Sequence, residues 1–303
     1  MSNHYPRIRV RMKDGFLLMR DGLSFTFYMR CPHHEVAPAV LRSLETYRSA
    51  VGPDALDRYM DQEGFFQEME FAAWEQLRRD MLTGDQIIFH LKDAARDEKG
   101  YQFRYHGKLF DEHSLAHDPD AVSVVSFWLP TEYLEEHGPG RVRELALELA
   151  GPLPFCSGQG GGSFNGEHGH RQVKRAVREL CFRYPGMDIP SPDRVAWHIG
   201  TRVRGAAWLT FVGQPVLGEM GGVEGLRSRL HSPETTVHSL EGERAVVTLG
   251  LWPEAGDMEQ GQTLPAYREL ARALEPWLYQ EPHPQDYDLT PEEMLRWERR
   301  FLD

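Results

Sequence analysis

The chain has 303 residues, 41% of them hydrophobic, and a formal net charge of −12. This length suits one large domain or two smaller ones, and the composition is that of a globular protein rather than a disordered one. The negative charge argues against direct binding to nucleic acid or to an anionic membrane surface, because both need clustered cations.

The expected compartment is the cytoplasm. Cys31, Cys156 and Cys181 are too few for a disulfide framework. The first residues lack the apolar core of a signal peptide, and no apolar run is long enough to span a membrane.

The first half of the chain predicts a β-hairpin, a helix and several strands. Asp21-Gly22 favours a tight turn between residues 16–19 and the alternating apolar residues 23–29. Apolar residues at helical spacing predict a helix over 36–51, which Gly52-Pro53 ends. The acidic segment over 54–77 predicts a further helix with its apolar residues on one face. Three strands and a helix follow at 87–91, 101–105, 122–128 and about 141–150.

Residues 151–170 form a Gly-rich stretch that predicts a flexible connector. Gly158–Ser163 lacks the Gly-Lys-Ser/Thr ending of a phosphate-binding P-loop. We therefore expect an N-terminal half at 1–150 and a C-terminal half at 171–303, which can also pack as one domain.

The second half predicts helices and strands in mixed order. Helical spacing marks 173–184, Leu226 with Leu230, and 265–278, and strands are expected at 197–203, 207–212, 235–239 and 244–252. Thr290, Pro291 and Glu293 predict a capping box at the start of a last helix.

This mixture indicates an α+β fold with mixed or antiparallel sheets and flanking helices, because regular βαβ alternation is missing. Trp128 leads to Arg143-Glu-Leu-Ala, and Trp252 leads to Arg268-Glu-Leu-Ala at nearly the same spacing. This repeated pattern suggests two pseudo-symmetric halves, although Arg-Glu-Leu-Ala is also an ordinary composition for a helix.

Two groups of residues bear on catalysis. Cys156 lies in a loop with histidines downstream, and Glu167, His168 and His170 could form part of a metal site. The cysteines are not paired as in structural zinc sites, and buried cysteines or solvated loop histidines explain the pattern as well. We expect no catalytic residue, metal or cofactor. A metal- or cysteine-dependent enzyme is the alternative.

Acidic residues are the candidate partner-binding residues. Residues 54–77 carry seven carboxylates and a single cation, Arg58. One interpretation is a solvated helix face, and the other is a surface that meets the Lys and Arg side chains of a basic partner. The candidates are Asp54, Asp57, Asp61, Glu63, Glu68, Glu70, Asp257 and Glu259, although an acidic turn explains the last two equally well.

An ordered series of motifs is similar to a known bacterial family. Its most specific part covers 207–278, and the terminal Trp297-Glu-Arg-Arg-Phe301 also fits. In the first half, Leu17-Leu18 with Leu23–Tyr28, and residues 129–134, fit its long members. The motifs of the second half are Trp208–Leu217, Gly221-Gly222 with Leu226 and Leu230, Leu249–Pro253, Gly256-Asp257, and Leu264–Arg268 running to Leu274-Glu-Pro276. The series resembles the type VI secretion immunity proteins for VRR-NUC nucleases, with Met220 where Leu is expected.

The resemblance implies an inhibitor that binds a toxic effector, a nuclease secreted by the type VI system, and occludes its active site or DNA-binding groove. It carries over no catalytic residues. Its shared residues are interpreted as fold-forming: Trp208, Trp252, Leu226 and Leu274 suit a core, and glycines such as Gly221 and Gly256 suit turns.

Overall fold

The computed structural model describes residues 4–84, 87–94, 100–110, 117–281 and 288–303. The chain divides into two compact units. Unit 1 comprises residues 1–24, 157–191 and 202–303, and unit 2 comprises residues 25–156 and 192–201. Each unit therefore takes segments from both sides of residues 151–170. The pseudo-symmetric halves at 1–150 and 171–303 stay a prediction.

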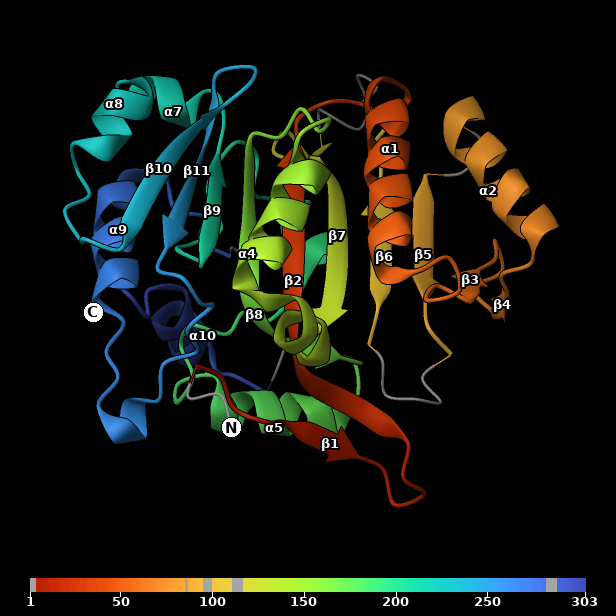
Figure 1. Ribbon diagram of the computed structural model, residues 1–303, viewed down its shortest axis with the longest axis horizontal. Helices are drawn as coiled ribbons and strands as arrows, with labels where there is room; N and C mark the ends of the chain where they lie inside the picture. Colours follow the sequence, from red (N-terminus) through yellow and green to blue (C-terminus); the bar gives the residue numbers. More distant parts are fainter. Residues whose placement is uncertain (1–3, 85–86, 95–99, 111–116, 282–287) are drawn as a thin grey trace. The chain divides into compact units, whose positions relative to one another are not determined.

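Unit 2 is built on an antiparallel sheet (Figure 1). Strand β2 (Leu17–Met29) runs out of unit 1 into unit 2 and is followed there, in spatial order, by β7 (Ser123–Pro130), β6 (Gln102–His106), β5 (Ile88–Lys92), β3 (Arg58–Met60) and β4 (Phe66–Glu68). Gln102 lies opposite Trp128, and Arg58 opposite both Lys92 and Glu68. The strands predicted at 87–91, 101–105 and 122–128 are confirmed.

The helices of unit 2 are α1 (His33–Val51), α2 (Phe71–Thr83), α4 (Thr131–Ala150) and the short α6 (Pro192–Val195). Helix α1 is confirmed with its end at Gly52, which has φ 98°. Its buried stripe includes Val36, Leu44 and Tyr47. The Tyr47 ring packs 5.3 Å from that of Phe127, and its hydroxyl donates a hydrogen bond to the Trp128 carbonyl. Aromatic packing with a satisfied hydroxyl fixes the helix on the sheet.

Unit 1 also has an antiparallel sheet. The spatial order is β10 (Thr235–Leu240), β11 (Arg244–Leu249), β9 (Leu209–Val212), β8 (Ser157–Gly166) and β2, on which β1 (Arg9–Arg11) also pairs. Its helices are α5 (Arg171–Leu180), α7 (Val216–Glu219), α8 (Gly222–Arg227), α9 (Pro265–Leu274) and α10 (Pro291–Glu298), with 3₁₀ turns η1 (Met258–Gln260) and η2 (Glu275–Trp277). The α+β fold class is confirmed.

Residues shared with the family mostly form the core of unit 1. Trp208, Leu226 and Leu274 are fully buried, as expected. Trp252 is only half-buried and stacks on His4 with ring centroids 4.8 Å apart. The capping box of α10 is confirmed, because Thr290 and Glu293 exchange side-chain to backbone hydrogen bonds.

The predicted hairpin turn at Asp21-Gly22 is wrong. Both residues lie inside the continuous strand β2, where the Asp21 carboxylate is fully buried. It accepts hydrogen bonds from the Ile8 amide at 2.7 Å and from the Arg9 guanidinium. The turn instead joins β1 to β2 around Gly15, which has φ 91°. Because residues next to and within β1 supply its hydrogen-bond donors, the buried Asp21 carboxylate is satisfied inside a strand and no turn is needed at this position.

Three further expectations are corrected. Residues 157–166 of the predicted flexible connector form the buried strand β8. Residues 54–70, read as part of a helical face, form a loop and the β3–β4 hairpin, and the helix begins only at Phe71. The strand expected at 197–203 is also absent, since the described residues there form turns and irregular backbone, with one isolated bridge between Val203 and Leu278.

Candidate functional site

Six of the eight predicted partner-binding residues lie on or beside the β3–β4 hairpin of unit 2. Asp61 holds the hairpin turn. One oxygen of its carboxylate accepts the amides of Glu63 at 3.0 Å and Phe65 at 2.9 Å, and the other accepts the Gln67 side chain at 2.7 Å. The hydrogen bond from Gln67, with those from the backbone, lowers the pKa of Asp61. Asp61 is thus an ionised turn-forming residue.

The other five carboxylates differ in their exposure to solvent. Asp54, Glu63, Glu68 and Glu70 are exposed, and Asp57 is half-buried. Glu68 pairs with Arg58 across the hairpin at 3.0 Å. Glu70 stands at the N-cap of α2, where its carbonyl accepts the Trp74 amide. The hairpin therefore presents ionisable oxygens along its outer side.

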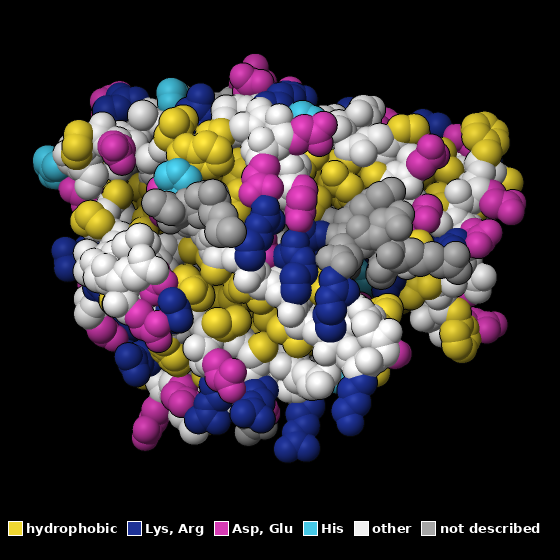
Figure 2. Space-filling model, turned by 60° about the horizontal axis from the view of Figure 1, so that its bottom comes forward, with side chains coloured by type: hydrophobic (Ala, Val, Ile, Leu, Met, Phe, Trp, Pro, Cys, Tyr) yellow, Lys and Arg dark blue, Asp and Glu magenta, His cyan; other side chains and the backbone are white. Residues whose placement is uncertain are grey.

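Sequence reasoning missed three phenylalanines among these carboxylates. Phe71 is 81% exposed, Phe65 64% and Phe66 37%. Phe66 is the most covered of the three, by the Lys92 ammonium 4.0 Å from its ring centroid and by the His90 ring at 4.9 Å. Figure 2 shows apolar side chains standing out between acidic ones on its right-hand side, where Figure 1 draws α2, β3 and β4. We name this set the acidic–aromatic surface: Glu63, Phe65, Phe66, Glu68, Glu70 and Phe71.

This surface has the composition of a protein-binding site. Aromatic side chains dominate the energetics of protein interfaces, whereas a polar and charged rim surrounds them. Neighbouring phenylalanines left in water also cost hydrophobic free energy that a partner would recover. The signal in the sequence was three Phe within seven residues of an acidic stretch, at spacings that do not place all three on one face of a helix.

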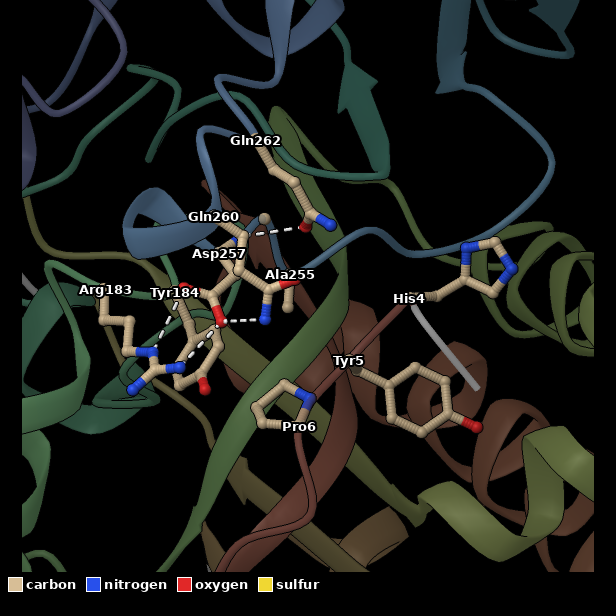
Figure 3. Close-up of a pocket in the computed structure, with 10 residues that line it drawn as sticks. His4, Tyr5, Pro6, Arg183, Tyr184, Ala255, Asp257, Gln260 and Gln262 are labelled. Atoms are coloured by element: carbon tan, nitrogen blue, oxygen red, sulfur yellow. Dashed lines mark hydrogen bonds and ion pairs between the residues drawn. The ribbon is translucent and has the colours of Figure 1, made fainter. Parts of the chain in front are cut away.

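Asp257 and Glu259, in unit 1, are arranged differently from the hairpin carboxylates. The Arg183 guanidinium donates to Asp257 through Nε at 3.1 Å and Nη2 at 2.8 Å (Figure 3). Its Nη1 lies 2.6 Å from Glu259. The side chain of Gln260 and the Glu259 amide also donate to Asp257. The hydrogen bond from Arg183 lowers the pKa of Asp257.

These contacts give Asp257 a role within unit 1. The carboxylate is buried and its oxygens are occupied, whereas the Glu259 side chain is largely exposed. The pocket beside them measures about 270 Å³ and is lined also by His4, Tyr5 and Gln262. Glu259 is therefore the more accessible of the two predicted residues.

Cations gather on a different element of unit 1. Helix α5 carries Arg171, Lys174, Arg175 and Arg178, and Figure 2 shows a group of Lys and Arg side chains on the face drawn. Arg175 pairs with Glu179 at 3.0 Å and Arg178 with Glu293 at 2.9 Å. Arg175 and Arg178 are therefore matched by carboxylates of the same unit.

The residues of the alternative enzyme prediction lie in ordinary structural positions. Burial raises the pKa of the Cys156 thiol, which disfavours the nucleophilic thiolate. His170 Nδ1 accepts the Gln172 amide at 3.2 Å and caps α5. The Glu167 amide donates to the Leu18 carbonyl, and His168 is half-buried beside it. Over the part of the chain that the structure describes, no three His, Cys, Asp or Glu side chains converge as metal ligands.

Among the described residues, no helix combines the length and apolar character needed to cross a membrane.

The fold has a close counterpart of known structure. The Pseudomonas aeruginosa T6SS protein PA0821 is similar with a TM-score of 0.78 and 21% identity, over 98% of this chain and 88% of that chain. At this identity the likeness concerns the fold alone. No curated protein matches the chain.

The family comparison covers most of the sequence. The model of the TsiV family, described as type VI immunity for VRR-NUC, matches residues 39–301. This span includes the acidic–aromatic surface and the motifs of the second half. The chain belongs to the TsiV family of type VI immunity proteins for VRR-NUC effectors.

Proposed function

We propose that this chain neutralises a cognate VRR-NUC effector by binding it through the acidic–aromatic surface and covering its active site or DNA-binding groove. The inhibition is stoichiometric and requires no chemistry, metal or cofactor from this chain. It takes place in the cytoplasm of the producing cell, and the chain itself does not bind nucleic acid. One observation carries the proposal: the Phe65 and Phe71 side chains are exposed to solvent among carboxylates.

The proposed contact combines two kinds of free energy. Burying Phe65 and Phe71 against a partner removes large apolar areas from water, and each buried phenyl ring contributes about 1.5–3 kcal/mol. The surrounding carboxylates meet the cations with which a nuclease holds phosphate, and this complementarity speeds the encounter. Asp257 and Glu259 remain proposed partner contacts, and Glu259 is the accessible member of that pair.

The test is a titration of effector nuclease activity with purified chain. The effector encoded beside this gene should lose its activity at about equimolar wild-type chain. Phe71→Ala should weaken binding at least tenfold, because interface aromatics are the side chains whose truncation costs most. Its thermal stability should stay close to that of wild type, since an 81% exposed ring makes few contacts in the free protein.

Leu251→Ala provides the matched control. Leu251 is a similarly exposed apolar residue, at 69%, and lies in unit 1 outside the acidic–aromatic surface. The control should inhibit like wild type. Nuclease activity that persists in a molar excess of wild-type chain would refute the proposed function, and equal inhibition by Phe71→Ala and wild type would refute the proposed surface.

A further inference from the structure

A small pocket lies within unit 2 beside the acidic–aromatic surface. It has a volume of about 190 Å³ and is bounded by α2, by β3 with its turn, and by β5. We name it the α2–β3 pocket, after Tyr59, Met60, Asp61, Leu77, Asp80 and Leu91. Small-molecule sites usually enclose about 300–1,000 Å³, so this volume suits a single side chain better than a metabolite.

The floor and the rim of the α2–β3 pocket differ in chemistry. Leu77 and Leu91 are buried apolar residues on the floor. Asp61 and Asp80 supply two carboxylates. Such a combination matches a long cationic side chain, whose alkyl stem packs on apolar surface while its charged head meets the carboxylates.

Asp80 retains acceptor capacity for such a head group. Its Oδ1 accepts the Gln76 side-chain amide at 2.5 Å, whereas Oδ2 accepts no hydrogen bond from the residues that the structure describes. The two oxygens of Asp61 already hold the hairpin turn, so Asp61 adds its charge at the rim rather than a free acceptor.

The histidine in the lining of the pocket does not oppose a cation. His90 lines the pocket, and burial, with the nearby Arg104 charge, lowers its pKa to about 3. The ring is therefore neutral near pH 7. The nearby Lys92 ammonium lies over the Phe66 ring and is not among the residues that line the pocket.

We propose that the α2–β3 pocket receives one arginine or lysine side chain of the effector, with its stem on Leu77 and Leu91 and its charged head at Asp80. This inference rests on the proposed function and names the chemistry that the partner must supply there. A nuclease that holds a DNA backbone carries such cations on its binding surface, which is the charge complement of this rim.

Two variants of the pocket test the proposal by different means. Asp80→Asn removes one of the two carboxylate charges of the rim, and Ala73→Leu fills the pocket from helix α2 without changing charge. Glu136→Gln, an exposed carboxylate on α4 of the same unit, is the matched control. Binding of the purified effector, in a catalytically inactive form, is measured by calorimetry, and folding of each variant by circular dichroism.

Both pocket variants should raise Kd about tenfold, and the control should bind like wild type. Asp80→Asn should also flatten the dependence of Kd on salt concentration, whereas Ala73→Leu should keep it. Because leucine favours helix, Ala73→Leu keeps the test decisive if Asp80→Asn perturbs α2.

The outcomes separate this inference from the proposed function. If wild-type chain does not bind the effector, both are wrong. If wild type binds and Phe71→Ala weakens binding, but Asp80→Asn and Ala73→Leu bind like wild type, the surface stands and the pocket assignment is overturned.

Discussion

Asp21 illustrates how a single residue departs from its local sequence signal. Its carboxylate has no exposed surface, and it receives the Ile8 amide and the Arg9 guanidinium. Arg7 lies at 3.5 Å from the second oxygen. A buried carboxylate is tolerated only with such charge-assisted partners, and these contacts attach the N-terminal residues to β2.

Replacing Asp21 by Asn should therefore destabilise the protein. The variant keeps the shape of the side chain but loses its charge, and hydrogen bonds to charged groups contribute about 1.5–3 kcal/mol. We expect the free energy of unfolding in urea to fall by about 2 kcal/mol. Asp14→Asn, in the exposed β1–β2 turn, should change it by less than about 0.5 kcal/mol. Equal effects of the two substitutions would contradict the role given to Asp21.

The sequence could not have placed Asp21 inside a strand, nor shown that the phenylalanines are exposed to solvent. Asp-Gly favours a turn when the neighbouring residues alone decide, but the amide of Ile8 is supplied by tertiary structure. Phe66 lies in the acidic segment 54–77, for which the sequence alone predicts a helical face. Only the hydrogen bonds that Asp61 makes to its own turn reveal that Phe65 is carried outward on a hairpin.

At the scale of the element, β8 departs furthest from expectation. Its glycines allow close contact between backbones, which composition alone cannot distinguish from flexibility. A Cβ atom on Gly166 would lie 2.5 Å from the Leu18 carbonyl oxygen and 2.7 Å from the Met19 Cβ, so β2 passes directly against it. The glycine at this position is required by packing.

Gly166→Ala should accordingly be costly while Gly169→Ala should not. A Cβ on Gly169 meets no atom within 4 Å, and both glycines belong to the same Gly-rich stretch. Overpacking against backbone costs about 1–3 kcal/mol, which should appear as a lower melting temperature for Gly166→Ala alone. A flexible connector would instead tolerate both substitutions, and that result would contradict the assignment of β8.

Elements with strong local signals were predicted well. The spacing of apolar residues located α1, and Thr290, Pro291 and Glu293 located the start of α10. These signals act within one or two turns of helix, so no tertiary contact is needed to interpret them. The α2–β3 pocket is different, because α2, β3 and β5 approach one another only in the folded unit.

For the whole molecule, the net charge of −12 should govern how fast a basic effector is captured. Electrostatic steering raises association rates, and salt screens it over about 10 Å at 0.1 M. We expect the association rate constant, measured by stopped-flow fluorescence, to fall as sodium chloride rises from about 0.05 to 0.5 M, with a smaller change in dissociation.

A variant with Glu63, Glu68 and Glu70 replaced by Gln should show a shallower decrease in association rate. The matched control replaces Glu135, Glu136 and Glu144 of α4 in the same way. It carries the same net charge as the first variant but keeps the acidic–aromatic surface. Identical salt dependences for the two triple variants would show that the total charge, and not the hairpin, steers the encounter.

The chain passes between its two units four times, and unit 1 needs the last third of the sequence to complete its sheet and core. During synthesis on the ribosome, the sheet and core of unit 1, to which the first 24 residues belong, therefore stay incomplete until β9, β11 and α10 emerge. Truncated nascent chains would leave β8 without its neighbour β9 and should be substrates for chaperones and proteases. Under the proposed function, protection would then begin only after α10 has been synthesised, so the rate of translation would set its onset.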